Sequence, residues 1–406
     1  MMANLKNIVL ILVAFQLNCV ALSKKAAEPM PAQAPGAPLQ AGAERMDVYL
    51  PLLAGKTVAL LVNNTSMVGS THLADTLLSK GVKVVKIYAP EHGFRGEADA
   101  GEHVKDGKDN QTGIQLESLY GSTRRPNAGS LAGIDLVLFD IQDVGARFYT
   151  YISSMHYMMD ACAEFGVRFM VLDRPNPNGH YVDGPILDTA YRSFVGMHPV
   201  PVVHGMTVGE YARMINGEGW LSEGRQCMLE VIPCTGYTHA TAYALPVRPS
   251  PNLPNMRAIY LYPSTCFFEG TVASEGRGTN DQFQVYGHPD FPDGDYTFTP
   301  VSMPGAKSPK LEGKLCRGHS LVSRAPEDIR AEGRLNFSYL LAFYRNFPDK
   351  GNFFLVSHFD RLAGSDMLRH QIIDGKSEAE IRQSWQEGLA VFKKVRRRYL
   401  LYDDFE

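Results

Sequence analysis

The clearest structural signal in this chain lies at "IDLVLFDIQD" (residues 134–143), an apolar run that ends in polar residues. A second run of the same kind, "VRFMVLDRP" (167–175), follows a segment from about Phe148 to Phe165 with helical periodicity. Near-continuous runs of Val, Leu, Ile and Phe are typical of parallel strands buried on both faces, and a helix between two such strands makes a βαβ unit. The segment therefore predicts a parallel sheet with helices packed on both of its faces.

The same alternation continues on both sides of this unit. Before it, strands are expected at "TVALLVNN" (57–64) and "VKVVKIYAP" (82–90), with a helix near "THLADTLLSKG" (71–81) between them. After it, a helix at "TVGEYARMINGEG" (207–219) and a strand at "CMLEVIPC" (227–234) extend the pattern. We therefore predict an α/β fold, in which a Rossmann-like three-layer domain contains a mainly parallel sheet.

The sequence changes character near Pro246. The segment "PVRPSPNLPN" (246–255) is interrupted by prolines, and irregular glycine-rich stretches and later helices follow it. We therefore predict a Rossmann-like N-terminal domain at 46–245 and a smaller α+β C-terminal domain at 246–406. The active site is expected in the cleft between the two domains, where ligand sites often form.

The first residues have the features of a secretory signal. Lys6 precedes the apolar run "NIVLILVAF" (7–15), which is too short to span a bilayer. We predict a signal peptide at 1–23 and a flexible, Ala- and Pro-rich linker at 24–45. The chain is then exported and periplasmic, and lipid anchoring through Cys19 is the alternative.

Composition narrows the classes of function. The 406-residue chain has 20% charged residues and a formal net charge of −3, which gives no strong preference for nucleic acid or an anionic membrane. The chain contains no GxGxxG, GxSxG, HExxH or Walker motif, which argues against dinucleotide, serine-hydrolase, zinc-peptidase and P-loop chemistry. The cysteines beyond the leader are too few to form a disulfide framework. We predict no cofactor, no metal, no nucleic-acid partner and no stable membrane span.

Polar side chains follow four of the predicted strands, at the edge of the sheet where ligands bind. Asn, Asp, Pro and Gly are also turn formers, so "NNTS" (63–66) and "DRPNPNG" (173–179) have a second interpretation as turns. Asp143 likewise has a second interpretation as the cap of the following helix. The candidates are Asn64 after the first strand, Glu91 and His92 after the second, Asp140 and Asp143 after the third, and Arg174 after the fourth.

The segment "APEHGFRGEADAGEHV" (89–104) holds the densest group of titratable residues. Glycoside hydrolysis needs a carboxylic acid that protonates the leaving oxygen, and Glu91 at a strand end is the leading candidate. Burial or a neighbouring acid such as Glu97 or Asp99 would keep such a carboxyl protonated near neutral pH. The competing hypothesis is a metal site made of Glu91, His92, Glu102 and His103.

A second candidate loop, "YPSTCFFEGTVASEGRGT" (262–279), lies in the predicted C-terminal domain. It has one interpretation as a glycine-rich surface loop. In the other, it brings Glu269, Glu275 and Arg277 to the interdomain cleft, where Arg277 holds a substrate carboxylate.

A family resemblance rests on ordered segments that run through nearly the whole chain from about residue 50. They are "PEHGFRGEADAGE" (90–102), "DLVLFDIQDVGARFYTYISSM" (135–155), "VLDRPNPNG" (171–179), "GPILD" (184–188), "RSFVGMHPVPVVHGMTVGE" (192–210), "PSPNLPN" (249–255), "YPSTCFFEGTVASEGRGT" (262–279) and "FDRLAGSDMLRHQIIDGKS" (359–377). In these segments the chain resembles the exo-acting β-N-acetylmuramidases, the NamZ-type peptidoglycan hexosaminidases of glycoside hydrolase family 171.

The resemblance implies two domains, a Rossmann-like one and a smaller C-terminal one, with the active site between them. It also implies release of N-acetylmuramic acid (MurNAc) from the non-reducing end of peptidoglycan fragments, with muropeptides or MurNAc-GlcNAc saccharides as partners. The glutamate of the Pro-Glu-His-Gly segment is the suspected catalytic acid of the family, which carries over to Glu91. The lactyl carboxylate of MurNAc calls for a cation, for which Arg277, Arg95 and Arg147 are the candidates.

We therefore predict an exo-β-N-acetylmuramidase with Glu91 and Asp143 as catalytic residues. Its stereochemical outcome stays open, because the 2-acetamido group of the substrate is a possible internal nucleophile. Two other functions stay open: a non-catalytic exported protein that binds a cell-wall sugar or peptide, and a metal-dependent hydrolase. The residues predicted to bind substrate are Asn64, His92, Arg95, Asp140, Arg147, Arg174, Glu269, Glu275 and Arg277.

Overall fold

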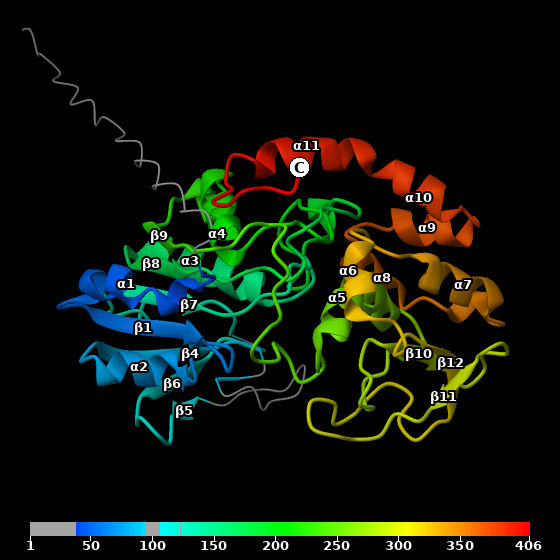
Figure 1. Cartoon of the computed structure of the whole chain (residues 1–406), viewed down its shortest axis with the longest axis horizontal. Helices are drawn as coiled ribbons and strands as arrows, with labels where there is room; N and C mark the ends of the chain where they lie inside the picture. The colour runs from blue at the N-terminus through cyan, green and yellow to red at the C-terminus, as the bar shows by residue number, and fades with distance from the viewer. Residues whose placement is uncertain (1–37, 92, 95–105, 122) are drawn as a thin grey trace, which may run out of the picture.

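The computed structural model describes residues 38–91, 93–94, 106–121 and 123–406 (Figure 1). The predicted signal peptide (1–23), most of the predicted linker (24–45), His92 and Arg95 lie outside these described residues. Among the helices that the structure describes, none is long and apolar enough to cross a bilayer. The described cysteines are all buried and free.

The N-terminal part is built on a sheet with the strand order β5-β6-β4-β1-β7-β8-β9. Neighbouring strands are parallel except β5 and β6, which form an antiparallel edge. All five strands expected from the apolar runs are present, so the predicted mainly parallel sheet is confirmed. The strands are β1 (Thr57–Val62), β4 (Lys83–Ala89), β5 (Gly107–Lys108), β6 (Gln115–Ser118), β7 (Leu136–Asp140), β8 (Arg168–Leu172) and β9 (Leu229–Ile232), with a small hairpin of β2 (Met67–Val68) and β3 (Thr71–His72) after β1.

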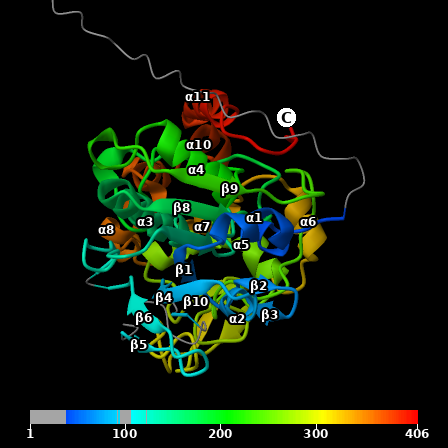
Figure 2. The same ribbon diagram turned by 90° about the vertical axis from the view of Figure 1, so that its left-hand side faces the viewer.

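Successive side chains of a strand point to opposite faces, and two separate sets of buried residues result. Leu60 of β1 packs in one apolar cluster with α1 and α2, whereas its neighbour Leu61 packs in another with α3 and α4. Figure 2 shows helices on both sides of the sheet, so the predicted three-layer arrangement is confirmed. The helices are α1 (Met46–Leu53), α2 (Leu73–Ser79), α3 (Tyr151–Phe165) and α4 (Val208–Gly217).

The strand order reverses beside β1, which is where open α/β sheets form a ligand crevice. The chain adds β4 and β6 on one side of β1 and then returns as β7 on its other side. The loops after β1 and β7 bind each other at this point: the backbone N–H of Gln142 donates to the Thr65 hydroxyl at 2.9 Å. Glu91 follows β4, on the other side of β1.

The C-terminal part combines a small antiparallel sheet with helices (Figure 1). Its strand order is β10-β12-β11, which agrees with the predicted α+β character. The strands are β10 (Val285–His288), β11 (Tyr296–Phe298) and β12 (Cys316–Ser320). The helices are α5 (Met256–Thr265), α6 (Pro326–Ala331), α7 (Ser338–Asn346), α8 (Val356–Ala363), α9 (Met367–Ile373), α10 (Glu378–Ser384) and α11 (Gln386–Arg396).

The tail after α11 returns to the N-terminal part. The Tyr402 hydroxyl donates to Asp173 at 2.5 Å, and the backbone N–H of Leu401 donates to Glu210 at 2.8 Å. One buried apolar cluster also contains residues of both parts. The two parts are therefore packed together over a shared core, and the predicted boundary between residues 245 and 246 stays a prediction.

Candidate active site

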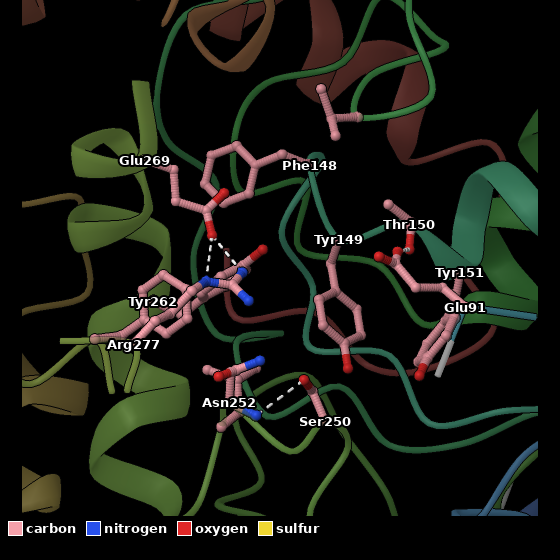
Figure 3. Close-up of a pocket in the computed structure, with 13 residues that line it drawn as sticks. Glu91, Phe148, Tyr149, Thr150, Tyr151, Ser250, Asn252, Tyr262, Glu269 and Arg277 are labelled. Atoms are coloured by element: carbon pink, nitrogen blue, oxygen red, sulfur yellow. Dashed lines mark hydrogen bonds and ion pairs between the residues drawn. The ribbon is translucent and has the colours of Figure 1, made fainter. Parts of the chain in front are cut away.

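A pocket lies between the two parts of the chain (Figure 3). It contains about 540 Å³ of empty space, some of it open to solvent. We call its N-terminal side, made of Glu91, Tyr149, Thr150 and Tyr151, the acid wall, and its C-terminal side, made of Tyr262, Glu269 and Arg277, the ion-pair wall. Phe148, Val195, Ser250, Asn252, Leu253 and Phe283 complete the lining.

Glu91 is nearly buried in the acid wall, with 9% of its surface exposed. The Tyr120 hydroxyl donates to its Oε1 at 2.8 Å, and the Thr150 hydroxyl donates to its Oε2 at 2.6 Å. Both carboxyl oxygens therefore have a neutral donor within the described residues. The two hydroxyl groups therefore fix the orientation of this carboxyl.

Strand register brings Tyr120 to Glu91. Ala89 of β4 and Ser118 of β6 are partners in the parallel ladder, and the backbone N–H of Leu119 continues it by donating to the Ala89 carbonyl at 2.9 Å. Glu91 and Tyr120 each lie two residues beyond that pair. Because side chains repeat every two residues along a strand, both extend on the same side and meet.

The ion-pair wall is organised around Arg277. Its Nε donates to Glu269 Oε1 at 3.1 Å, and its Nη2 also contacts that oxygen. The guanidinium carbon lies 5.2 Å from the centre of the Phe283 ring. Burial alone would lower the pKa of Arg277, but the charges of Glu269 and then Glu275 outweigh it and raise that pKa above the ordinary value. Arg277 is therefore a permanent cation at the pocket.

Glu275 and Lys310 support this wall from behind. Lys310 Nζ lies 3.0 Å from Glu275 Oε2 and donates to the carbonyls of Phe268, Thr271 and Ala273 at 2.9, 2.9 and 2.6 Å. Burial acts to raise the pKa of Glu275, yet the charge of Lys310, followed by that of Arg277, lowers it below the usual value. Glu275 is thus a buried carboxylate that does not line the pocket, and its predicted contact with substrate is replaced by a supporting role.

The pocket belongs to a chain whose two halves both match known family models. The model "Exo-beta-N-acetylmuramidase NamZ, N-terminal" matches residues 58–257, and "Exo-beta-N-acetylmuramidase NamZ, C-terminal" matches residues 260–402. The chain belongs to the NamZ family. The peptidoglycan β-N-acetylmuramidase NamZ of Bacillus subtilis (strain 168) is 37% identical in an alignment over 374 residues that covers 87% of this chain and 89% of that protein. The predicted resemblance is confirmed, and this NamZ family member is a glycosidase.

Solved structures show the same fold. A DUF1343 family protein of Bacteroides fragilis NCTC 9343 is 49% identical with a TM-score of 0.84, covering 91% of this chain and 100% of that one. A second DUF1343 family protein of the same strain is 27% identical with a TM-score of 0.75, covering 90% and 99% of the respective chains. The fold of this NamZ family member therefore agrees with those of solved relatives.

Asp143, predicted as the second catalytic residue, does not line the pocket of this NamZ family member. Its Oδ1 accepts the backbone N–H of Gly145 at 2.7 Å, and its Oδ2 is buried without a hydrogen-bond partner among the described residues. Burial, only partly offset by backbone N–H donors, raises its pKa to about 7. It is not a helix cap either, because the N-cap of α3 is Thr150.

Three further predicted substrate-binding residues at strand ends bind protein groups instead. Asp140 is fully buried, and its Oδ2 lies 2.9 Å from Arg174 Nη2. Burial would lower the pKa of Arg174, but the charge of Asp140 raises it. Asn64 donates through Nδ2 to the Arg248 carbonyl at 3.1 Å. None of these three residues lines the pocket. Their contacts instead hold the segments that follow the strands in place.

Arg147, predicted to bind the lactyl carboxylate, is completely buried away from the pocket. Its Nη1 donates to the carbonyls of Pro185 and Val200, and its Nη2 donates to those of Leu362 and Ala363, at 2.7 to 2.8 Å. Burial lowers its pKa to about 9. The structure therefore corrects this prediction: Arg147 joins the end of α8 to the N-terminal part.

The residues that the structure adds to the candidate site are Tyr120, Thr150 and the aromatic side chains that line the pocket. Only strand register could have indicated Tyr120, since 29 residues separate it from Glu91. Within the described part of the chain, no group of three or more His, Cys, Asp or Glu side chains is placed to hold a metal ion. His92, Glu102 and His103 of the metal hypothesis lie outside that part.

Proposed function

We propose that this NamZ family member is an exo-acting glycosidase that releases MurNAc from the non-reducing end of peptidoglycan fragments, with Glu91 as general acid. One observation carries the proposal: a nearly buried carboxyl with neutral hydrogen-bond donors lies in the same pocket as a permanent cation (Figure 3). The carboxyl suits proton transfer, and the cation suits recognition of an anionic sugar.

Arg277 is the proposed ligand of the lactyl carboxylate. Its Nε and Nη2 contact Glu269, whereas its Nη1 makes no hydrogen bond to a described residue. A planar guanidinium with one edge held by a protein carboxylate can direct a remaining N–H to a substrate carboxylate. The rings of Tyr149, Tyr262 and Phe283 offer apolar surface against which a sugar ring packs.

In the proposed reaction, Glu91 transfers its proton to the glycosidic oxygen as the bond from that oxygen to the anomeric carbon breaks. The leaving sugar departs as an alcohol, and Glu91 becomes a carboxylate whose oxygens accept from Tyr120 and Thr150. Water completes the reaction at the anomeric carbon and returns a proton to the site.

A second group must act at the anomeric carbon, and Asp143 was the prediction for it. Because Asp143 is buried outside the lining, we propose that Glu269 or the substrate's own 2-acetamido group acts there instead. Proton NMR of the fresh product reports its configuration. An inverted product supports Glu269 as a base for water and rejects the acetamido group, whereas a retained product rejects Glu269 as such a base.

The test of the proposed function uses the purified protein with a chromogenic MurNAc β-glycoside and with a MurNAc-GlcNAc disaccharide. We expect release of the chromogenic alcohol and of free MurNAc. No release from either substrate would reject the function. Tight binding without turnover, measured by calorimetry, would support the alternative of a cell-wall binding protein, and loss of turnover with chelator would support a metal-dependent hydrolase.

The variant Glu91→Gln tests the acid, because an amide cannot transfer the required proton. We expect kcat to fall about 10²- to 10⁴-fold. The matched control is Glu387→Gln, which removes an exposed carboxylate on α11 and leaves kcat unchanged. Full activity of Glu91→Gln would assign the acid to another residue.

Export to the periplasm is part of the proposal and is supported by the signal-like residues 1–23. Fractionation of cells that express the full chain is the test. We expect a processed protein in the periplasmic fraction, and labelling of Cys19 with a fatty-acid probe would show lipid anchoring instead.

A further inference from the structure

Glu91 accepts hydrogen bonds from two elements that are far apart in the sequence. Tyr120, beyond β6, donates to Oε1, and Thr150, at the start of α3, donates to Oε2. Thr150 lines the pocket together with Glu91, whereas Tyr120 is not part of the lining. Oε2 of Glu91 therefore lies on the pocket side of the carboxyl, and Oε1 is bound by Tyr120 from behind the pocket wall.

Thr150 occupies a position where threonine normally serves the helix. At an N-cap, a threonine side chain usually accepts a backbone N–H of the first helical turn. Thr150 is the N-cap of α3, yet its side chain makes no capping hydrogen bond. Its hydroxyl donates to Glu91 instead, at 2.6 Å. The first turn of α3 therefore lacks the usual side-chain capping hydrogen bond, because the Thr150 hydroxyl is used to bind the Glu91 carboxyl.

Tyr120 is held in place by its ring as well as by strand register. The ring lies 6.0 Å from that of Phe194, centre to centre. Phe194 is in turn covered by Arg124, whose guanidinium carbon lies 4.3 Å from the ring centre, and it stacks with Tyr157. The phenol therefore reaches Glu91 from a packed aromatic group.

We propose that Tyr120 and Thr150 are positioning residues that orientate Glu91 and stabilise the carboxylate that forms when Glu91 gives up its proton. This inference rests on the proposed role of Glu91 as general acid. Hydrogen bonds to a carboxylate strengthen as its negative charge develops, so both hydroxyls favour the transition state over the ground state. Neither residue exchanges a proton with the substrate in this scheme.

Four variants test the inference: Tyr120→Phe, Thr150→Val, Thr150→Ser and the control Tyr157→Phe. Tyr157 stacks on the same Phe194 ring, and its hydroxyl makes no hydrogen bond to a described residue. For Tyr120→Phe and Thr150→Val we expect kcat to fall about tenfold with KM changed less than about twofold. Thr150→Ser keeps the hydroxyl and should retain kcat within about threefold, and Tyr157→Phe should resemble the parent protein.

The pH profile of kcat separates positioning from a merely structural effect. A general acid must be protonated, so activity falls on the alkaline side as Glu91 ionises. Loss of a donor that favours the carboxylate should move this alkaline limb upward by about half a pH unit in Tyr120→Phe and Thr150→Val. The other titratable or charged groups at the pocket, Tyr149, Tyr151, Tyr262, Glu269 and Arg277, are unchanged in all four variants.

Failure of the proposed function and failure of the positioning role would give different results. If the parent protein does not hydrolyse MurNAc glycosides, or if Glu91→Gln is fully active, the proposed function or its acid is wrong. If the parent is active and depends on Glu91, but the alkaline limb of both donor-deficient variants stays in place, the positioning role is wrong. Thermal unfolding shows whether Tyr120→Phe is folded; should it unfold, the pair Thr150→Val and Thr150→Ser still decides the question.

Discussion

The two walls of the pocket hold their carboxylates in opposite ways. In the acid wall, Glu91 accepts hydrogen bonds from the neutral hydroxyls of Tyr120 and Thr150. In the ion-pair wall, Glu269 contacts Arg277. The first carboxyl is thus held by hydroxyl donors, and the second by a guanidinium.

The difference extends to what lies behind each wall. Behind the ion-pair wall, Glu275 and Lys310 form another charged pair at 3.0 Å. Near the acid wall, Asp143 is buried without a cationic partner in the described residues, and burial raises its pKa to about 7. The described contacts of the ion-pair wall are therefore between charges that compensate each other, whereas those of Glu91 are with hydroxyl groups.

After Glu91→Gln, the largest effect on catalysis is expected from Arg277→Met, which removes the permanent cation of the ion-pair wall. For a MurNAc glycoside, kcat/KM should fall about 30- to 100-fold, since a hydrogen bond between charged groups is lost. For a GlcNAc glycoside, which lacks the lactyl carboxylate, activity should change much less. Arg277→Lys is the control that keeps the charge but loses the planar fork. An equal fall in kcat/KM for both glycosides would show that Arg277 does not bind the lactyl carboxylate.

A smaller effect is expected from Lys310→Met, which leaves Glu275 buried beside only one cation. The free energy of unfolding in urea should fall by about 2 kcal/mol, below the value of about 3–5 kcal/mol for fully buried pairs because Lys310 is partly exposed. KM should rise as the loop that carries Glu269 loosens, while the alkaline limb of the pH profile stays in place. A shifted limb would mean that the two walls are electrostatically coupled.

The smallest effect on catalysis is expected from Asp143→Asn. In the unfolded chain this carboxyl ionises near its ordinary value of 3.8, but in the folded protein it does so near pH 7. Between these values the folded state holds the extra proton, so the stability of the parent protein falls as pH rises through this window. The variant lacks this fall, so between pH 4 and pH 8 it should gain stability relative to the parent, by on the order of 4 kcal/mol over the whole window.

Urea unfolding at pH 5 and pH 8 measures this difference, with the exposed Asp293→Asn as control. A gap between variant and parent that is equal at both pH values would place the Asp143 carboxyl in a solvated environment. Loss of kcat by more than about 10²-fold in Asp143→Asn would return this residue to the catalytic role first predicted from the sequence.

The sequence predicted five of the seven described strands of the large sheet, and it placed Glu91 at the end of one of them. Apolar runs at 57–64, 82–90 and 134–143 marked parallel strands because burial on both faces requires apolar residues throughout. Glu91 was found because a glutamate directly after such a strand must lie at the edge where ligands bind. Strands β5 and β6 were missed because both are short, β5 is exposed, and β6 is only partly buried.

What the tertiary structure alone decided is which charged side chains reach the pocket. Arg147 and Arg277 are both arginines in segments typical of the family, yet Arg147 donates to Leu362 and Ala363, more than 200 residues away, whereas Arg277 lines the pocket. Periodicity along the chain reports whether a residue is buried locally. Which group a charged side chain contacts depends on how distant segments pack together. The local spacing of residues in the sequence does not show it.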